Sequence, residues 1–148
     1  MLRQIALAIM TLGAGGVGMM CLAARSSVGE EPKPAETRVY EMRTYTTHDG
    51  RLPALLARFR DHTMRLFEKH GIRNGMYWVP TDEKLSQNTL IYILSYDSAE
   101  SAKKSWEAFK ADPEWTKVKT ESEKDGPIVK KVDSVYMKAT DFSPRPNP

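Results

Sequence analysis

The pattern of hydrophobic and polar residues changes its period several times along the chain. Residues 38–46, RVYEMRTYT, alternate with a period of two and are rich in β-branched and aromatic residues, which is typical of a strand. Residues 51–70 carry apolar positions at helical spacing, which predicts an amphipathic helix that ends at Gly71. Its predicted apolar stripe consists of Leu52, Leu55, Leu56, Phe59, Leu66 and Phe67.

Three more strands and a second helical region follow. Residues 72–79 and 88–96 predict strands, and the latter, NTLIYILSY, is apolar on both faces and is therefore expected at the centre of a sheet. A helix is expected after residue 97, with a restart at Asp112-Pro113-Glu114, because proline is favoured at the first helical position. Residues 131–140 predict the last strand.

The resulting order is β-α-β-β-α-β, which predicts an α+β, ferredoxin-like fold with a four-stranded antiparallel sheet and helices on one face. A sheet covered on one side leaves its other face open. If that face is apolar it needs a partner, and a symmetric homodimer is the usual solution.

The first 24 residues have the layout of a secretory signal peptide. Arg3 gives a positive start, residues 5–20 form an apolar run, and Ala23 and Ala24 are small residues suited to cleavage. The alternatives are a retained membrane anchor and a lipoprotein modified at Cys21. We expect an exported protein, periplasmic or extracellular, that has no membrane association after cleavage.

The remaining composition divides the chain into a domain and its flanks. Residues 25–37 contain prolines and glutamates and predict a disordered linker, and the proline-rich residues 143–148 predict a disordered tail. The folded domain is therefore expected at 38–142. All 13 aromatic residues lie beyond position 38, so the core is expected there as well.

Charge and motif content exclude several classes of function. The 22 basic and 19 acidic residues are interspersed without a basic cluster, so no nucleic-acid binding is expected. A single cysteine excludes a disulfide framework and a four-cysteine zinc site. No HxH or HExxH spacing occurs, so neither a metal nor another cofactor is expected.

Two groups of residues are candidates for catalysis. Glu41, Arg43 and Tyr45 share one face of the first strand, with about 7 Å between alternate residues, and are expected to line a cavity or to form a structural ion pair. His62 falls at the margin of the apolar helix stripe, where it is expected either to point into a pocket as a general base or to form a hydrogen bond at the helix flank.

Aromatic residues supply candidates for ligand binding. The candidates are Trp78, Tyr96 and Trp106. They are expected either to line an aromatic pocket or to belong to the hydrophobic core, where aromatic residues at these spacings are found more often.

Several segments together resemble the NIPSNAP family. They are YEMRTYT at 40–46, FRDHTMRLFEKHGI at 59–72, the tryptophan strand at 77–79, YILSYDS at 92–98 and WEAFKADPEW at 106–115. The resemblance spans roughly residues 38–140. It implies a dimeric α/β barrel in which two ferredoxin-like subunits pack sheet against sheet, and it implies no settled reaction.

Hypotheses from three classes of function remain. The first is an exported, dimeric binding module, of unknown biochemical activity, for a small apolar ligand or a protein partner. The second is a cofactor-free monooxygenase or isomerase of the dimeric α/β-barrel type, which uses His62 and the strand face of Glu41, Arg43 and Tyr45. The third is a haem-binding relative that uses a histidine ligand.

Overall fold

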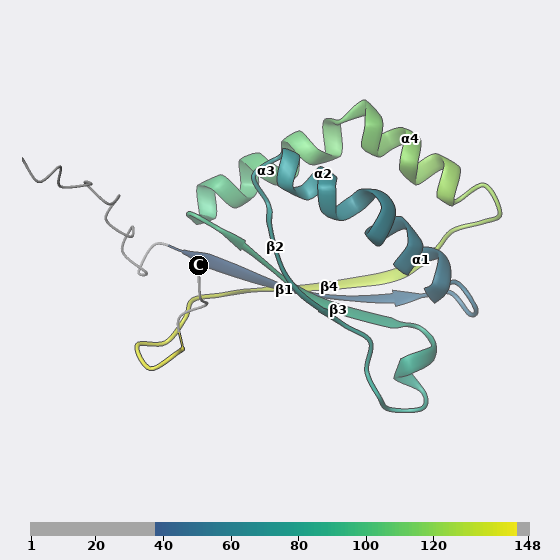
Figure 1. Ribbon diagram of the computed structural model, residues 1–148, viewed down its shortest axis with the longest axis horizontal. Helices are drawn as coiled ribbons and strands as arrows, with labels where there is room; N and C mark the ends of the chain where they lie inside the picture. The colour runs from purple at the N-terminus through teal and green to yellow at the C-terminus, as the bar shows by residue number, and fades with distance from the viewer. Residues whose placement is uncertain (1–37, 145–148) are drawn as a thin grey trace, which may run out of the picture. The chain divides into compact units, whose positions relative to one another are not determined.

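The computed structural model describes residues 38–144 (Figure 1). The predicted signal peptide (1–24), the linker (25–37) and residues 145–148 of the predicted tail lie outside the described residues.

A four-stranded antiparallel sheet forms one layer of the domain. Its strands are β1 (Val39–Thr47), β2 (Arg73–Trp78), β3 (Thr89–Tyr96) and β4 (Val129–Met137), in the spatial order β2-β3-β1-β4. The helices α1 to α4 all lie on one side of this sheet (Figure 1). The ferredoxin-like α+β prediction is confirmed, as is the inner position of the apolar strand β3.

The first predicted helix has the expected extent but contains a wider turn in its middle. It runs through α1 (Leu52–Arg58), a π-helical turn η2 (Phe59–Thr63) and α2 (Met64–Lys69). The Thr63 hydroxyl donates to the Arg58 carbonyl at 3.1 Å and so satisfies an acceptor within this turn. The buried positions Leu55, Phe59, Thr63 and Phe67 consequently follow one another at intervals of four residues.

The second helical region begins and restarts at side-chain caps. Helix α3 (Ala99–Ala111) begins at Ser98, which forms a reciprocal capping box with Ser101. Helix α4 (Pro113–Ser122) begins at Asp112, whose carboxylate accepts the backbone N–H of Glu114 at 2.8 Å. The predicted restart with proline at the first helical position is confirmed. A short 3₁₀ turn, η3 (Leu85–Gln87), lies between β2 and β3.

The core lies between the sheet and the helices. Tyr92 and Leu94 of β3 are fully buried there, together with Leu55 and Phe67 from the helices above. Gly75 allows β2 to approach β3 at a break in their register, because a Cβ at this position would lie 2.6 Å from the Ile93 carbonyl oxygen.

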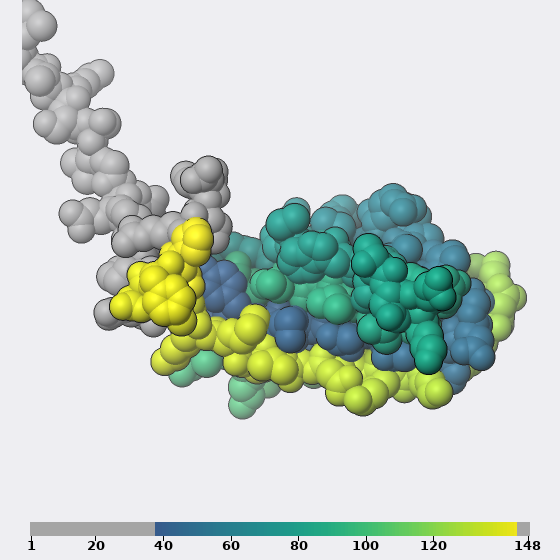
Figure 2. Space-filling model, turned by 90° about the horizontal axis from the view of Figure 1, so that it is seen from below, coloured from purple at the N-terminus to yellow at the C-terminus, as the bar shows by residue number. Residues whose placement is uncertain are grey.

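The opposite face of the sheet carries no helix from α1 to α4 (Figure 2). Alternation along the strands places Met42 of β1 and Ile93 of β3 on this face, directly opposite each other in register. Val135 of β4 is the other cross-strand neighbour of Met42 and is 50% exposed. Met76 and Trp78 extend the exposed apolar surface along β2. Among the described residues, this face therefore carries an apolar patch of the kind on which the homodimer prediction depends, and the Lys131–Asp133 ion pair lies on the same face farther along β4.

Within residues 38–144, no helix is both long enough and apolar enough to cross a membrane.

Candidate functional site

A cavity of about 930 Å³ lies between the sheet and the helices. Its floor is made by the helix-facing side chains of two neighbouring strands, Glu41, Arg43 and Tyr45 from β1 and Val132, Ser134 and Tyr136 from β4. Its roof comes from five helical segments, α1, η2, α2, α3 and α4. The cavity reaches the surface beside β4, because this edge strand is largely exposed.

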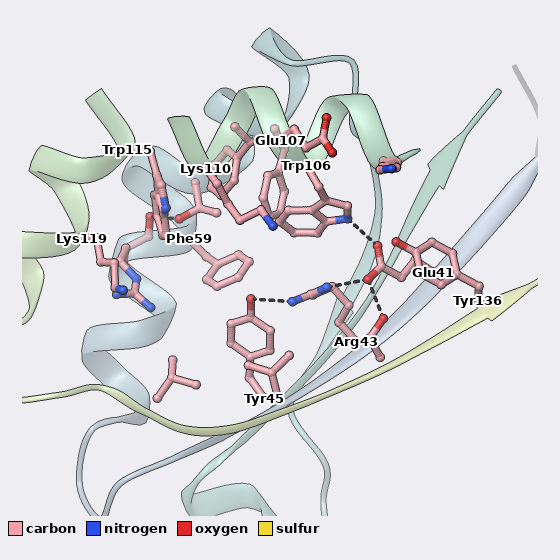
Figure 3. Close-up of a pocket in the computed structure, with 18 of the residues that line it drawn as sticks. Glu41, Arg43, Tyr45, Phe59, Trp106, Glu107, Lys110, Trp115, Lys119 and Tyr136 are labelled. Carbon is pink, nitrogen blue, oxygen red and sulfur yellow. Dashed lines mark hydrogen bonds and ion pairs between the residues drawn. The ribbon is translucent and has the colours of Figure 1, made fainter. Parts of the chain in front are cut away.

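Glu41 is the centre of a hydrogen-bond cluster at one side of the cavity (Figure 3). Its side chain is 1% exposed, and both carboxylate oxygens are used. Oε1 accepts from Arg43 Nη1 at 2.5 Å and from the Ser134 hydroxyl at 2.6 Å. Oε2 accepts from the Tyr96 hydroxyl at 2.7 Å and from Trp106 Nε1 at 2.8 Å. A buried carboxylate with four donors is well satisfied, so it holds β1, β3, β4 and α3 together.

These donors also keep Glu41 ionised. Burial alone raises the pKa of the Glu41 carboxyl, but its hydrogen bonds, the one from Ser134 foremost, and the charge of Arg43 hold the pKa below the ordinary value of 4.5. Burial, followed by the hydrogen bond to Glu41, raises the pKa of Tyr96 well above its ordinary value, so Tyr96 stays a donor.

Arg43 lies beside Glu41 and faces aromatic rings. Its guanidinium carbon lies 4.4 Å from the ring centre of Trp106 and 5.5 Å from that of Tyr45. Its Nη2 donates to the Tyr45 hydroxyl at 3.3 Å, whereas its Nε is buried and makes no hydrogen bond within residues 38–144. Arg43 is therefore fixed in position, and its buried Nε has no hydrogen-bond acceptor among the described residues.

Aromatic rings form the middle of the cavity wall. Phe59 of η2 contacts Tyr45 edge to face, with ring centres 5.8 Å apart. Trp106 and Trp115 approach the same space from α3 and α4, and both pack on Phe109, at 5.6 Å and 4.6 Å. In Figure 3, Phe59 and Tyr45 lie between the Glu41–Arg43 pair on one side and Trp115 with Lys119 on the other. The cavity thus has an aromatic middle and polar groups at both sides.

The side formed by α4 contains a second ion pair. Arg58 Nη1 lies 3.0 Å from Glu123 Oε1, and the Arg58 side chain is 4% exposed. The guanidinium carbon of Arg58 is 5.5 Å from the ring centre of Trp115. Lys119 lies between Trp115 and Glu123 in sequence, four residues from each, so all three share one face of the helix.

The structure brings together most of the sequence-predicted site residues. Glu41, Arg43, Tyr45 and Trp106 line the cavity. Tyr96 is fully buried and supports Glu41 through its hydroxyl.

Trp78 and His62 do not line this cavity. Trp78 is 41% exposed at the end of β2, on the uncovered side of the sheet.

Of the two alternatives for His62, the structure does not show the one in which this residue points into a pocket between the helix and the sheet. His62 is exposed and lines an outer groove between α1 and α4. The π turn contributes to this placement, because a wider turn advances by a smaller angle per residue and so carries His62 farther from the buried face that Phe59 and Thr63 share. His70 ends α2 as predicted, and its Nε2 lies 2.7 Å from the Asp112 carboxylate.

Sequence reasoning missed several residues of the site. Ser134 had no signal, because only the pairing of β1 with β4 brings it to Glu41. The spacing of four between Trp115, Lys119 and Glu123 was a usable signal for a cavity-facing side of α4. Arg58 was hidden among the exposed charges of its helix.

Comparison with known proteins identifies the family. The NIPSNAP family model matches residues 40–144, and the chain belongs to the NIPSNAP family. No curated protein has significant sequence similarity to this chain.

Similar solved structures include members of the same family. A NIPSNAP family protein of unknown function from Agrobacterium tumefaciens is 23% identical with a TM-score of 0.63, over 74% of this chain and 94% of that one. A NIPSNAP domain protein from Burkholderia xenovorans is 21% identical with a TM-score of 0.61, over 72% and 99%.

A monooxygenase of Streptomyces coelicolor, solved in complex with the ligand nanaomycin D, is 11% identical with a TM-score of 0.53, over 77% and 96%. At this identity the likeness concerns the fold alone.

The described residues contain no group of three or more His, Cys, Asp or Glu side chains that could hold a metal ion. The cavity wall offers hydrogen-bond donors, aromatic faces and ammonium groups, which suit an organic ligand.

Proposed function

We propose that this NIPSNAP domain is a binding module that holds a small, largely apolar ligand in the cavity between its sheet and helices. The observation that carries the proposal is the cavity itself, of about 930 Å³, with an aromatic middle. Ligand pockets typically measure about 300–1,000 Å³ and combine apolar walls with a few fixed polar groups. Glu41 and Arg43 supply such fixed groups, since their mutual contact and their neighbours hold both in place.

The state of Glu41 favours binding over acid–base catalysis. A general base needs a free lone pair within reach of the substrate and a pKa near the working pH. Both oxygens of Glu41 already accept two hydrogen bonds each, and the pKa of Glu41 is lowered. Glu41 therefore supports the cavity wall and holds Arg43 in place.

A cofactor-free monooxygenase is the second candidate. The observation that favours it is the Tyr45 hydroxyl, which lies beside Arg43 at the cavity wall, in a fold similar to that of the Streptomyces monooxygenase. Oxygen consumption by the purified domain with 1-naphthol, compared with the Tyr45→Phe variant and heat-denatured protein, tests it. Uptake that depends on Tyr45 would support an enzyme, and uptake no faster than in denatured protein would exclude this reaction.

The same proposal includes a homodimer. The apolar patch around Met42, Ile93 and Val135 supports it. Exposure of such a patch to water is unfavourable in free energy, and a partner subunit that covers it removes this exposure. An Ile93→Glu variant would place a charge in the interface. Light scattering should give twice the monomer mass for the native chain and the monomer mass for this variant, whereas a native monomer would exclude the dimer.

Export is also part of the proposal. The positive, apolar and small-residue segments of residues 1–24 support a cleaved signal and a periplasmic or extracellular location. Mass measurement of the secreted protein tests it, and an intact Met1 on a membrane-bound product would contradict it.

The binding function is tested with a neutral fluorescent probe, N-phenyl-1-naphthylamine, together with mass spectrometry of any ligand retained through purification. We expect one probe per chain. A Val132→Trp variant fills the cavity from its floor and should abolish binding, while Val79→Trp, an equally exposed position outside the cavity, should retain it. Absence of binding in the native chain, or equal binding in both variants, would overturn the proposal.

A further inference from the structure

The cavity wall carries more positive than negative charge. Five of its lining residues are cationic and three are anionic. The cations are Arg43, Arg58, Lys103, Lys110 and Lys119, and the anions are Glu41, Glu107 and Glu123. The two arginines are already matched, Arg43 by Glu41 and Arg58 by Glu123. After these two ion pairs are set aside, the cavity wall retains three lysines and one glutamate, Glu107.

These lysines are set on the cavity side of α3 and α4. Lys103 and Lys110 are seven residues apart, which is two helical turns, so they lie on one face of α3. Lys119 lies on the same face of α4 as Trp115, whose ring belongs to the cavity wall. None of the three lysines makes an ion pair within residues 38–144. Their ammonium groups are available to a ligand.

Each of the two cavity arginines has a buried donor without a partner among the described residues. The Nε of Arg58 is inaccessible to solvent and makes no hydrogen bond within the described part of the chain, although the Arg58 side chain is 4% exposed. Buried N–H groups nearly always have an acceptor. Arg58 contacts Trp115 and Glu123, so this donor lies beside α4. Because the Nε of Arg43 is equally buried and unpartnered among these residues, this kind of donor occurs at both sides of the cavity, and the two sides differ in their lysines.

The two sides of the cavity therefore differ in what they offer a ligand. At the Glu41 side the carboxylate and guanidinium neutralise each other, and Lys103, one helical turn before Trp106, is of the three cavity lysines the nearest to them in the chain. At the α4 side, Lys119 adds uncompensated positive charge beside Trp115, and Lys110 of α3 extends into the space between Trp115 and Trp106, as the labelled side chains in Figure 3 show. The aromatic rings of Phe59 and Tyr45 lie between.

We propose that the ligand of this cavity is an aromatic acid whose flat apolar body lies against Phe59, Tyr45 and Trp106 and whose carboxylate is held by Lys110 and Lys119. This inference rests on the proposed binding function and adds the chemical class of the ligand. The aromatic faces favour a planar ring system over an alkyl chain.

The test compares two probes of nearly the same shape, 1-naphthoate and its neutral amide 1-naphthamide, by isothermal titration calorimetry with the native chain. We expect one naphthoate per chain, bound at least about tenfold more tightly than the amide, because only the acid gains from the ammonium groups. The advantage of the acid should shrink as salt concentration rises.

Two variants of α4 locate the acid group. Lys119→Glu changes a cavity residue, and Lys117→Glu makes the same change in net charge at a residue that faces the outer groove. We expect Lys119→Glu to weaken naphthoate binding about tenfold and to leave naphthamide within about twofold. Lys117→Glu should leave both affinities within about twofold, and Lys110→Glu should behave like Lys119→Glu.

The outcomes separate this inference from the function on which it rests. Equal affinity for naphthoate and naphthamide, or equal loss of naphthoate binding in Lys117→Glu and Lys119→Glu, would overturn the acid class while leaving a cavity that binds apolar molecules. If N-phenyl-1-naphthylamine binds and naphthoate does not, the acid class is also overturned and the binding function remains. Failure to bind any of the three probes would overturn the binding function itself.

Discussion

The indole Nε1 of Trp106 donates to Oε2 of Glu41 at 2.8 Å, and this contact joins residues that are 65 positions apart in the chain. It links α3 to the inner strand β1 at one side of the cavity. The same indole ring lies over the guanidinium of Arg43 at 4.4 Å, so one tryptophan fixes both members of the ion pair. The roof and the floor of the cavity are therefore held together by a polar contact in a largely aromatic site.

Removing the charge of Glu41 should lower the stability of the domain. Glu41→Gln takes the anion from a buried ion pair and leaves Arg43, whose side chain is 16% exposed, without its counter-ion. We expect the free energy of unfolding to fall by about 3 kcal/mol, measured by urea denaturation. Glu107→Gln, at an exposed cavity position, should change it by less than about 0.5 kcal/mol. A loss below about 1 kcal/mol in Glu41→Gln would show that the pair adds little to stability.

The stability of the domain should fall in acid partly through Glu41. Its pKa is lower in the folded chain than the ordinary value of 4.5, so its contribution is fully present above that pH and is lost as the pH falls below it. The stability difference between the native chain and Glu41→Gln should stay constant from about pH 7 to 5.5 and narrow below about pH 4.5. Denaturation curves at several pH values measure it, and a difference that widens in acid would contradict the lowered pKa.

The π turn should depend on the hydroxyl of Thr63. Thr63→Val keeps the shape of the side chain and leaves the Arg58 carbonyl without its 3.1 Å donor in a buried turn. We expect a loss of about 1–2 kcal/mol in the free energy of unfolding. Thr116→Val removes a similar bond at an exposed position of α4, where water can replace it, and should cost less than about 0.5 kcal/mol. Equal losses in the two variants would mean that the π turn needs no such bond.

His62 should be dispensable for both stability and binding. It is exposed and faces the outer groove, so His62→Ala should change the free energy of unfolding by less than about 0.5 kcal/mol. The affinity for N-phenyl-1-naphthylamine should remain within about twofold of the native value, since no side chain of the cavity is altered. If His62→Ala lowered probe binding or turnover without changing the free energy of unfolding, His62 would have a functional role.

The secondary-structure elements and their order can be predicted from local patterns in the amino-acid sequence. The alternation around Glu41, Arg43 and Tyr45 placed these side chains on one face of a strand, and the doubly apolar strand β3 had to be internal. Such patterns are local, with a period of two for a strand and nearly four for a helix, so they can be read without knowledge of the fold.

The tertiary structure decided which of these side chains meet. Only strand pairing brings Ser134 to Glu41, and only the packing of α3 on the sheet brings Trp106 to the same carboxylate. The π turn directed His62 to the outside while Thr63 stayed on the buried face, because a widened turn changes the phase of a helix. These contacts join distant residues through packing and register, which the periodicity of a single segment does not encode.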